Sequence, residues 1–298
     1  GWTELPMTDV EVVATVEGLR SRLEAERAAG RQVGLVPTMG FLHAGHASLI
    51  DAAVAGNNVT VVSVFVNPLQ FAPDEDLADY PRDPEADMDV CGRHGADLVF
   101  APSVAQMYPE PGVPEIEVGD LASRFEGASR PTHFGGVAMA VSRLFDIVGT
   151  SRAYFGEKDF QQLAVVRQMV ADHGVPVEVV GCPTVREHDG LALSSRNAYL
   201  TAAERREAPV LRRALLAGTA AVAGGEADPG AVASLMAEVI GGATTGELDY
   251  AAVIDPDTFE APPRITRAGV RLLVACRFGR ARLIDNMAAV PTDRKSVV

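Results

Sequence analysis

Short apolar runs alternate with amphipathic stretches through the first 186 residues of the chain. Apolar runs of about four to eight residues predict buried strands, and an apolar period near 3.6 predicts helices. Strands are predicted at 33–36, 59–66, 97–100, 152–155 and 175–180. A first helix is predicted between a cap at Thr8 or Asp9 and an end at Gly30, with Val12, Val16, Leu19 and Leu23 on one face. Further helices are predicted at 46–55, from Pro84 onward, at 136–148 and at 159–173. Alternating strands and helices predict an α/β fold with a parallel sheet, right-handed crossovers and ligands at the carboxyl ends of its strands.

The order of elements changes after residue 186, where helices come first and strands follow. Alanine-rich helices are predicted at 201–223 and 229–241, and strands at 250–254, 271–276 and 282–284. Consecutive helices followed by consecutive strands are typical of a separate α+β domain. The sequence therefore predicts two domains, 1–186 and 187–298, with a loose end at 292–298.

Composition and charge narrow the class of protein. Hydrophobic residues make up 47% of the 298 residues, which supports a sizeable core, and the formal net charge is −14. Such an acidic balance argues against a nucleic-acid partner but leaves room for a small anionic substrate in a local positive pocket. Cys91, Cys182 and Cys276 show no paired spacing, so neither a disulfide framework nor a zinc site is indicated. Without an evident signal peptide or bilayer-spanning run, the expected location is the cytoplasm, away from membranes.

Residues 36–49 join a predicted strand to a predicted helix and carry the first candidate site. Gly40 and Gly45 allow a sharp turn and a close approach to a ligand. His43 and His46 flank the start of the helix, where free N–H groups and the helix dipole attract anions such as nucleotide phosphates. Two alternatives stay open: ordinary loop histidines, or a zinc site, although helical zinc sites usually use i, i+4 spacing and further ligands.

Two further clusters carry phosphate chemistry. Lys158 offers a mobile positive charge, and Asp159 either caps a helix or binds a ribose hydroxyl. Ser194, Ser195 and Arg196 offer hydroxyl donors and a guanidinium that binds phosphate through two parallel bonds. Taken alone, the first cluster also fits a capped helix with solvated charges, and the second fits a polar linker at the domain boundary.

Seven motifs, in order and spacing, resemble those of the pantoate–β-alanine ligases. The matching strings are Pro37-Thr38-Met39-Gly40 with His43-x-Gly45-His46, Phe65-Val66-Asn67-Pro68-Leu69-Gln70-Phe71, Tyr80-Pro81-Arg82, Arg130-Pro131-Thr132-His133-Phe134, Phe155-Gly156-Glu157-Lys158-Asp159 with Gln161-Gln162, Pro183-Thr184-Val185-Arg186-Glu187, and Asp189-Gly190-Leu191-Ala192-Leu193-Ser194-Ser195-Arg196-Asn197. The resemblance runs from about Thr8 to Asn286. The first motif alone fits any nucleotidylyltransferase, whereas the ordered set is specific.

The resemblance implies a Rossmann-like nucleotidylyltransferase domain, a smaller α+β C-terminal domain that closes over it as a lid, and a homodimer. It implies that pantoate and ATP, with Mg²⁺, give pantoyl adenylate and pyrophosphate. β-Alanine then attacks the adenylate to give pantothenate, a precursor of coenzyme A, and AMP. The nearest alternative is another acid-adenylating or nucleotidylyl-transferring enzyme of the same superfamily, and a non-catalytic nucleotide sensor is a further one.

Site residues follow from the matched motifs. The resemblance implies catalytic roles for His43, His46 (as the acid), Lys158 and Arg196. It implies an ATP site made of Met39, Gly40, Phe41, Leu42, His43, Ala44, Gly45, His46, Gly156, Glu157, Lys158, Asp159, Val185, Leu193, Ser194, Ser195 and Arg196. It implies pantoate binding by Gln70 and Gln162, β-alanine binding by Gln70, and further pocket residues Tyr80, Met107, Arg130 and His133.

The chain departs from the family pattern in three places. Phe160 stands where the family usually has Tyr, and Leu193 where it often has Met, and both are apolar substitutes of similar bulk. In the segment 83–90, some relatives use adjacent acids and a Gln to help hold magnesium, but Ala86 and Val90 occupy two of those positions. Asp87 is the remaining candidate magnesium ligand, since Mg²⁺ binds mainly through ATP phosphates and water.

Overall fold

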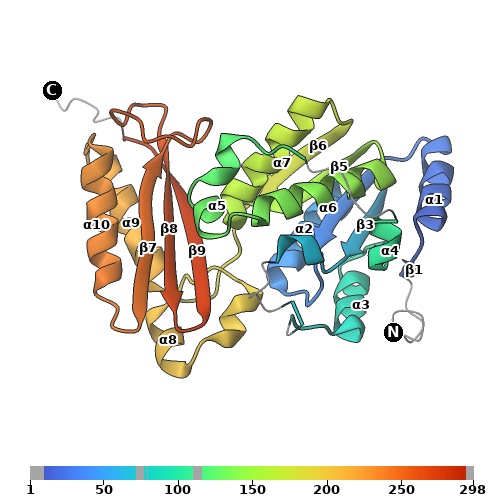
Figure 1. The fold of residues 1–298 in the computed structure, drawn as a ribbon, viewed down its shortest axis with the longest axis horizontal. Coiled ribbons are helices and arrows are strands. Elements are labelled where there is room, and N and C mark those ends of the chain that lie inside the picture. The colour runs from blue at the N-terminus through green and yellow to red at the C-terminus, as the bar shows by residue number, and fades with distance from the viewer. Residues whose placement is uncertain (1–9, 72–76, 79, 110–115, 293–298) are drawn as a thin grey trace. The chain divides into compact units, whose positions relative to one another are not determined.

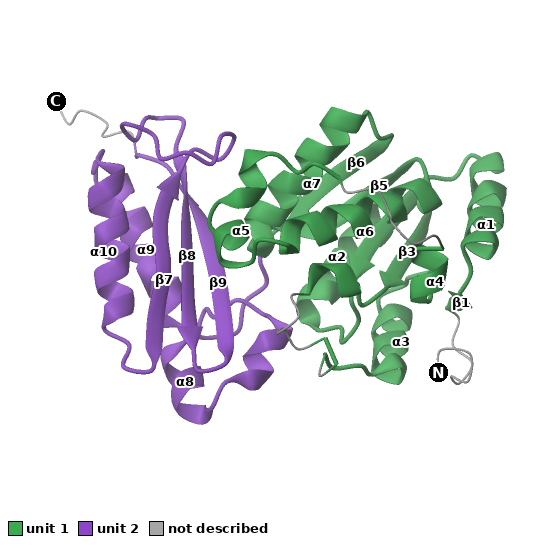
Figure 2. Cartoon of the chain, viewed as in Figure 1, with its two compact units in different colours: residues 1–183 green, residues 184–298 purple. Residues whose placement is uncertain are grey.

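The computed structural model describes residues 10–71, 77–78, 80–109 and 116–292. The chain divides into two compact units, residues 1–183 and 184–298 (Figure 2). The division lies three residues before the boundary expected from the sequence, at 186. Within the described part of the chain, no helix has both the length and the apolar character needed to cross a bilayer.

A six-stranded parallel sheet organises the first unit (Figure 1). Its order is β1-β4-β3-β2-β5-β6, and every neighbouring pair is parallel. The strands are β1 (Glu11–Val13), β2 (Val33–Thr38), β3 (Val59–Val64), β4 (Leu98–Phe100), β5 (Ser151–Gly156) and β6 (Val177–Cys182). The α/β fold with a parallel sheet is confirmed.

Helices cover both faces of this sheet, as the apolar runs of its strands require. Leu35 and Val61 belong to the core formed with α1, α6 and α7, while the next residues along the same strands, Val36 and Val62, belong to the core formed with α2 and α3. The helices are α1 (Val16–Ala28), α2 (Ala44–Gly56), α3 (Pro84–Arg93), α4 (Val104–Met107), α5 (Glu126–Ser129), α6 (His133–Val148) and α7 (Phe160–His173). Short 3₁₀ turns η2 (Pro68–Gln70), η3 (Asp120–Ser123) and η4 (Glu157–Asp159) lie between them.

The start of the first predicted helix is wrong. Val12 lies in β1, where it pairs with Val99 of β4, and α1 begins at Val16 with Thr15 Oγ1 accepting from the N–H of Gly18. Two adjacent β-branched valines favour a strand, but parallel pairing with a segment about 90 residues away leaves no local signal. The candidate caps Thr8 and Asp9 lie outside the described residues.

The second unit is the predicted α+β domain, with a three-stranded antiparallel sheet in the order β7-β8-β9. Its strands are β7 (Gly246–Ile254), β8 (Val270–Phe278) and β9 (Ala281–Ala289), and its helices are α8 (Ala202–Glu207), α9 (Val210–Ala223) and α10 (Pro229–Gly241), after the 3₁₀ turn η5 (Ser195–Tyr199). The predicted helix 201–223 is two helices, because Pro209 lacks the N–H that would continue the first.

Candidate active site

Three of the sequence motifs of the first unit converge at one edge of the parallel sheet. β2 lies between β3 and β5, so the segments that follow these three strands leave the same carboxyl edge side by side. The strand order reverses direction between β2 and β5, and ligands of open α/β sheets bind at such switch points. The fold therefore brings together the histidine loop after β2, the Gln70 segment after β3 and the Lys158 segment after β5.

The histidine loop, residues 38–46, turns through two left-handed residues. Gly40 has φ +80° and Phe41 has φ +52°, a conformation that costs a residue with a side chain about 1–2 kcal/mol. Thr38 Oγ1 accepts from the N–H of Gly40 at 3.1 Å and donates to the carbonyl of Ser63 at 2.8 Å. These bonds attach the start of the loop to β3.

Asp87 holds the far side of the same turn. Its Oδ2 accepts from the N–H of Phe41 at 3.0 Å and its Oδ1 accepts from the N–H of Leu42 at 2.7 Å. Hydrogen bonds to a charged group contribute about 1.5–3 kcal/mol each, which is enough to offset the strain at Phe41. Burial raises the pKa of Asp87, and the two N–H donors oppose that shift.

The two histidines cap the first turn of α2 with their own side chains. His43 Nδ1 accepts from the N–H of Gly45 at 3.1 Å, and His46 Nδ1 accepts from the N–H of His43 at 3.2 Å. Their ring centroids lie 4.1 Å apart. A ring nitrogen that accepts a hydrogen bond carries no proton, so each neutral ring carries its proton on Nε2. Both Nε2–H groups are thus left as donors for a ligand.

Electrostatics keep these rings neutral. Burial, together with the neighbouring His43, lowers the pKa of His46 to about 3, while Asp159 opposes the shift. Burial also lowers the pKa of His43, with Lys158 adding to the effect. At physiological pH the pair therefore supplies hydrogen bonds, and positive charge has to come from other side chains.

Lys158 is a source of that charge. It lies in η4 directly after β5, and its side chain is 17% exposed, with Nζ 3.7 Å from Asp159 Oδ1. Its charge acts on both histidines, which places it with them at the switch point. The structure thus brings the first and second predicted clusters together.

Gln161 and Gln162 differ in role although they are adjacent. Gln161 is buried, donates to the carbonyls of Leu121 and Arg124 at 2.8 and 2.7 Å, and accepts from the N–H of Glu126 at 3.1 Å. Gln162 is half-buried, and its side-chain amide makes no hydrogen bond with another described residue. Gln162 is therefore the one with an amide to offer a ligand, as its predicted role in pantoate binding requires.

Gln70 is held by a residue that the sequence reasoning did not select. Asn67 is buried, and its amide donates to Gln70 Oε1 at 3.2 Å and to the carbonyl of Gly136 at 2.9 Å. Gln70 Nε2 points to Met39 Sδ at 3.0 Å, and the Gln70 carbonyl lies 3.3 Å from His133 Nδ1. The sequence signals for Asn67 were its place in a matched motif and its position directly before a proline at the end of a buried strand.

The remaining predicted pocket residues of the first unit have different surroundings. The ring of Tyr80 lies 6.0 Å from that of Phe71 in an edge-on contact. Met107 is fully buried in the main core, and its carbonyl accepts from Arg143 Nε at 3.0 Å. Arg130 directly follows α5.

In the second unit, the predicted ATP-site residues lie on one small hairpin and the turn after it. The N–H of Leu193 donates to the carbonyl of Val185 at 3.0 Å, and Arg186 and Ala192 form an antiparallel β-bridge. Ser194 Oγ then accepts from the N–H of Arg196 at 3.2 Å and starts η5. The structure thus brings Val185, Leu193, Ser194, Ser195 and Arg196 together within this unit.

A buried ion pair anchors this hairpin to β9. Arg186 Nη1 and Nη2 bind the two carboxylate oxygens of Asp285 at 2.5 and 2.9 Å, and Arg186 also donates to the carbonyl of Gly190. The Asp285 side chain is 2% exposed and that of Arg186 is 16% exposed. Removal of either partner would leave a buried charge without compensation.

The described residues contain no preformed cluster of metal ligands. None of them forms a cluster of three or more His, Cys, Asp or Glu side chains suited to a metal ion. Among the residues that the structure describes, no third protein ligand therefore joins His43 and His46 for the zinc alternative. Asp87, the candidate magnesium ligand, is 2% exposed and has both carboxylate oxygens engaged by the histidine loop. Its role in magnesium binding stays a prediction.

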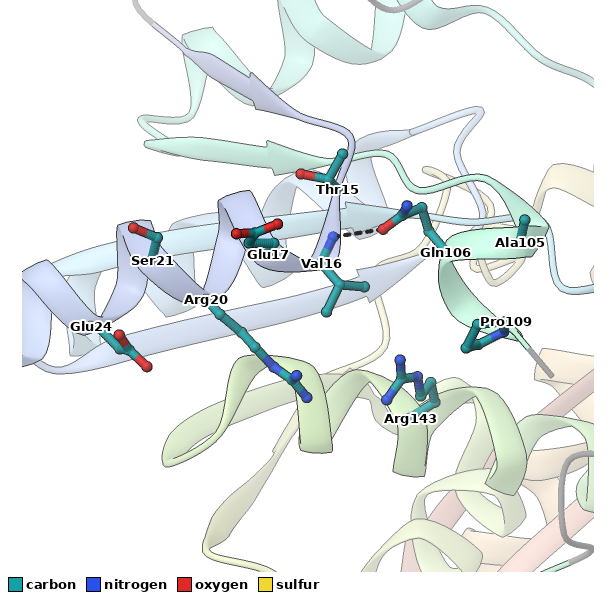
Figure 3. Close-up of a pocket in the computed structure, with 10 residues that line it drawn as sticks. All are labelled: Thr15, Val16, Glu17, Arg20, Ser21, Glu24, Ala105, Gln106, Pro109 and Arg143. Carbon is teal, nitrogen blue, oxygen red and sulfur yellow. Dashed lines mark hydrogen bonds between the residues drawn. The ribbon is translucent and has the colours of Figure 1, made fainter.

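A cavity of about 680 Å³ lies elsewhere in the first unit, between α1, α4 and α6 (Figure 3). None of the predicted site residues lines it. Its two arginines, Arg20 and Arg143, share one carboxylate oxygen, Asp146 Oδ2, at 2.9 and 2.7 Å. The cavity is therefore separate from the residues of the candidate active site.

Comparisons with known proteins point to one family. The family model of pantoate-beta-alanine ligase matches residues 11–288. A pantothenate synthetase of Thermus thermophilus is 51% identical over 286 residues, which cover 95% of this chain and 100% of the relative. A pantothenate synthetase of Sinorhizobium medicae is 47% identical over 286 residues, which cover 96% of this chain and 98% of the relative.

Solved structures agree with the sequence comparisons. The crystal structure of pantothenate synthetase from Thermus thermophilus has a TM-score of 0.89 at 49% identity and covers 95% of this chain and 100% of that one. A Francisella tularensis pantoate-beta-alanine ligase, described as complexed with beta-gamma ATP and beta-alanine, has a TM-score of 0.77 at 30% identity. The match covers 94% of this chain and 97% of that one. The neutral histidine donors beside Lys158 thus lie in a chain that belongs, over nearly its whole length, to the pantoate–β-alanine ligase family, the ATP-dependent enzymes that condense pantoate with β-alanine.

Proposed function

We propose that this chain makes pantothenate through a pantoyl adenylate. A carboxylate oxygen of pantoate attacks the α-phosphorus of ATP, and the bond to pyrophosphate breaks. The neutral amine of β-alanine then attacks the acyl carbon, AMP leaves with the bonding electrons, and the amine loses a proton to solvent. Neither step needs a nucleophilic side chain, because ATP activates the acid. The observation that carries the proposal is the pair of Nε2–H donors beside Lys158 at the switch point.

The histidines are proposed to stabilise charge as it builds on the phosphates. Neutral His43 and His46 donate through Nε2 to phosphate oxygens, and fixed donors of this kind strengthen as negative charge develops in the transition state. Lys158 supplies the positive charge that the neutral rings lack. His46 therefore acts as a hydrogen-bond donor, which refines the acid role implied by the resemblance.

The other ATP contacts are assigned from the matched motifs. In the first unit they are the remaining loop and strand-end residues, Met39, Gly40, Phe41, Leu42, Ala44, Gly45, Gly156, Glu157 and Asp159. In the second unit they are Val185, Leu193, Ser194, Ser195 and Arg196, where the guanidinium of Arg196 suits a phosphate. We assign this second unit the role of a lid.

Neutral amides are proposed to bind the acid substrate. Gln70 and Gln162 orient the hydroxyls and carboxylate of pantoate, and Gln70 also contacts β-alanine. Amides can do this because they donate and accept hydrogen bonds without burying an opposing charge. Tyr80, Met107, Arg130 and His133 complete the proposed pocket.

Magnesium, assembly and location complete the proposal. Magnesium bound with ATP neutralises phosphate charge, and the scarcity of clustered carboxylates in the described part of the chain suits an ion held mainly by phosphates and water. The proposed assembly is a homodimer, as is usual in the family. Because the reaction consumes ATP, the proposed location is the cytoplasm.

Exchange of labelled pyrophosphate into ATP tests the stepwise mechanism. With pantoate and Mg²⁺ present and β-alanine absent, the enzyme should catalyse exchange, because the first step does not need the amine. Lys158→Ala should abolish the exchange and still convert supplied pantoyl adenylate and β-alanine to pantothenate. Folded enzyme that shows no pantoate-dependent exchange would contradict the adenylate mechanism. Equal exchange with acids that lack the hydroxyls of pantoate would support the alternative of a different acid-adenylating enzyme.

A further inference from the structure

Asp87 is the one carboxylate of α3 that faces the histidine loop. It lies in the first turn of the helix and is 2% exposed, whereas Glu85 and Asp89 on the same helix are exposed. Its two oxygens accept from consecutive N–H groups, those of Phe41 and Leu42. Such an arrangement fixes the orientation of two peptide planes at once.

The loop is built to let this carboxylate come close. A Cβ atom on Gly40 would lie 2.9 Å from Asp87 Oδ2 and 2.9 Å from Val64 Cγ1, so no side chain fits there. The next residue, Phe41, keeps a left-handed φ of +52° although it has a side chain. A strained residue persists where its surroundings hold it, and here the neighbouring N–H bonds to Asp87 do so.

The segment held by Asp87 leads directly into the histidine cap. Leu42 is followed by His43, whose N–H donates to His46 Nδ1 and whose own Nδ1 accepts from Gly45. A different path of the chain at 41–42 would move the N–H of His43 away from His46. The cap that selects the Nε2–H form of both rings therefore depends on the position of residues 41 and 42.

We propose that Asp87 is a positioning residue for the His43–His46 pair and not a magnesium ligand. The inference rests on the proposed function for its kinetic consequence, since it takes the histidines as donors to the phosphates. Mg²⁺ requires near-octahedral oxygen coordination and keeps several waters. The carboxylate of Asp87 is instead enclosed by the loop, and Asp83 of the same segment accepts from the N–H of Ala86 to cap α3.

The first test separates positioning from metal binding. Asp87→Asn keeps the size of the side chain but offers one acceptor oxygen to two N–H donors. We expect kcat for pantoate-dependent pyrophosphate exchange to fall about 10–100-fold, with KM for ATP changed less than about threefold, because misplaced donors weaken the transition state most. Asp87→Ala, which removes both acceptor oxygens, should lower this kcat further. The Mg²⁺ concentration for half-maximal rate should stay unchanged, and excess Mg²⁺ or Mn²⁺ should restore nothing.

Glu85→Gln is the matched control, since this acid lies on the same turn of α3 and is exposed. It should leave kcat and the Mg²⁺ dependence unchanged. A thermal melt of each variant verifies that it is folded. If Asp87→Asn raises the Mg²⁺ requirement tenfold and added metal restores the rate, Asp87 is a metal ligand and the proposal is wrong. Unchanged kcat in Asp87→Asn also overturns it.

A spectroscopic readout tests positioning without turnover. In ¹⁵N-labelled protein without ATP or metal, the wild-type rings of His43 and His46 should show the Nε2–H form, and the amide protons of Phe41 and Leu42 should resonate downfield. Asp87→Asn should shift both amides upfield and mix the two ring forms, while Glu85→Gln should not. Unshifted amides and rings in Asp87→Asn contradict the proposal. If wild-type protein shows these signatures but no pantoate-dependent exchange, the proposed function fails and the positioning role stands.

Discussion

The histidine loop of the first unit and the 185–197 hairpin of the second carry similar chemistry but are held in different ways. Side chains satisfy the backbone N–H groups of the histidine loop, through Thr38, Asp87 and the two histidines themselves. The hairpin is held by backbone bonds between its own strands and by one ion pair to β9.

This difference predicts how each segment responds to substitution. In the histidine loop, each side chain determines the local path of the chain, so a change acts first on the chemistry. In the hairpin, backbone bonds are independent of most side chains, so a change acts first on stability, and the Arg186–Asp285 pair is the exception that affects both. The predictions below are ordered from the largest expected effect to the smallest.

Removal of one partner of the buried pair should destabilise the second unit most. Asp285→Ala leaves the Arg186 guanidinium buried without its partner and should cost about 3–5 kcal/mol of unfolding free energy, measured in urea by circular dichroism. Arg186→Met with Asp285→Leu should recover most of this loss, because no charge stays buried. A single variant as stable as wild type would show that the pair does not anchor the hairpin.

His46→Ala should act on the chemical step. Loss of a donor that stabilises the transition state typically costs about 3 kcal/mol, or roughly a hundredfold in kcat, with little change in KM for ATP. Initial rates of pyrophosphate exchange measure this, with His173→Ala on the exposed end of α7 as the control. A raised KM at unchanged kcat would mean that His46 contributes equally to ground-state binding.

Acid should destabilise the first unit through the same histidine. Burial lowers the pKa of His46 to about 3, below the ordinary value of 6.5, so the unfolded chain binds more protons between these values. Well above pH 6.5, His46 is neutral in both states and folding carries no protonation penalty. As the pH falls below 6.5, the unfolded chain gains a proton that the folded protein does not take up, and the free energy of unfolding decreases. From pH 7 to pH 5 the loss should be about 2 kcal/mol.

The comparison with His46→Gln isolates that contribution. Gln cannot take up a proton in this range, so its unfolding free energy should fall less between pH 7 and pH 5 than that of wild type. Urea titrations at the two pH values measure the difference. Equal pH dependence in both proteins would show that His46 is readily protonated in the folded state.

The smallest effects should come from single hydroxyls, one in each segment. Thr38→Val removes the acceptor for the N–H of Gly40 and should lower kcat several-fold, as expected where side chains set the path of the chain. Ser194→Ala removes the acceptor for the N–H of Arg196 and should cost about 1 kcal/mol of stability with a modest rise in KM for ATP. The reverse pattern would contradict the comparison of the two segments, namely a lower kcat in Ser194→Ala and a lower unfolding free energy in Thr38→Val.

The sequence predicted those parts of the molecule that leave a local signal. The buried strands β2 and β3 are apolar runs, and α3 begins where Pro84 follows a capping aspartate. The local pattern does not predict β1, because its parallel partner β4 is far along the chain, and the alanine-rich pattern of 201–223 continues across the break at Pro209. Local patterning finds elements, whereas long-range pairing is decided by packing.

The candidate site shows the same limit. His43, His46 and Lys158 were predicted as a phosphate site, and the fold places them together at the sheet edge. The sequence could not show that Asn67, which donates to Gln70, is anchored to Gly136, or that Asp87 meets the histidine loop, since each of these contacts is a hydrogen bond between distant segments. Nor could it tell that Gln161 is structural and Gln162 available, because the two differ only in which side of α7 they face.

The cysteines make the wild-type protein a convenient background for site-directed labelling. Cys91, Cys182 and Cys276 are unpaired and buried. Burial raises the pKa of Cys91 to about 12 and of Cys276 to about 11, and it also raises that of Cys182, so none offers an exposed thiolate to maleimide reagents at neutral pH. The substitutions Glu85→Cys and Val290→Cys, at two exposed positions, would therefore take up fluorophores selectively without removal of any native thiol. Energy transfer between the two dyes would report the distance between the labelled positions, one in each unit, during turnover.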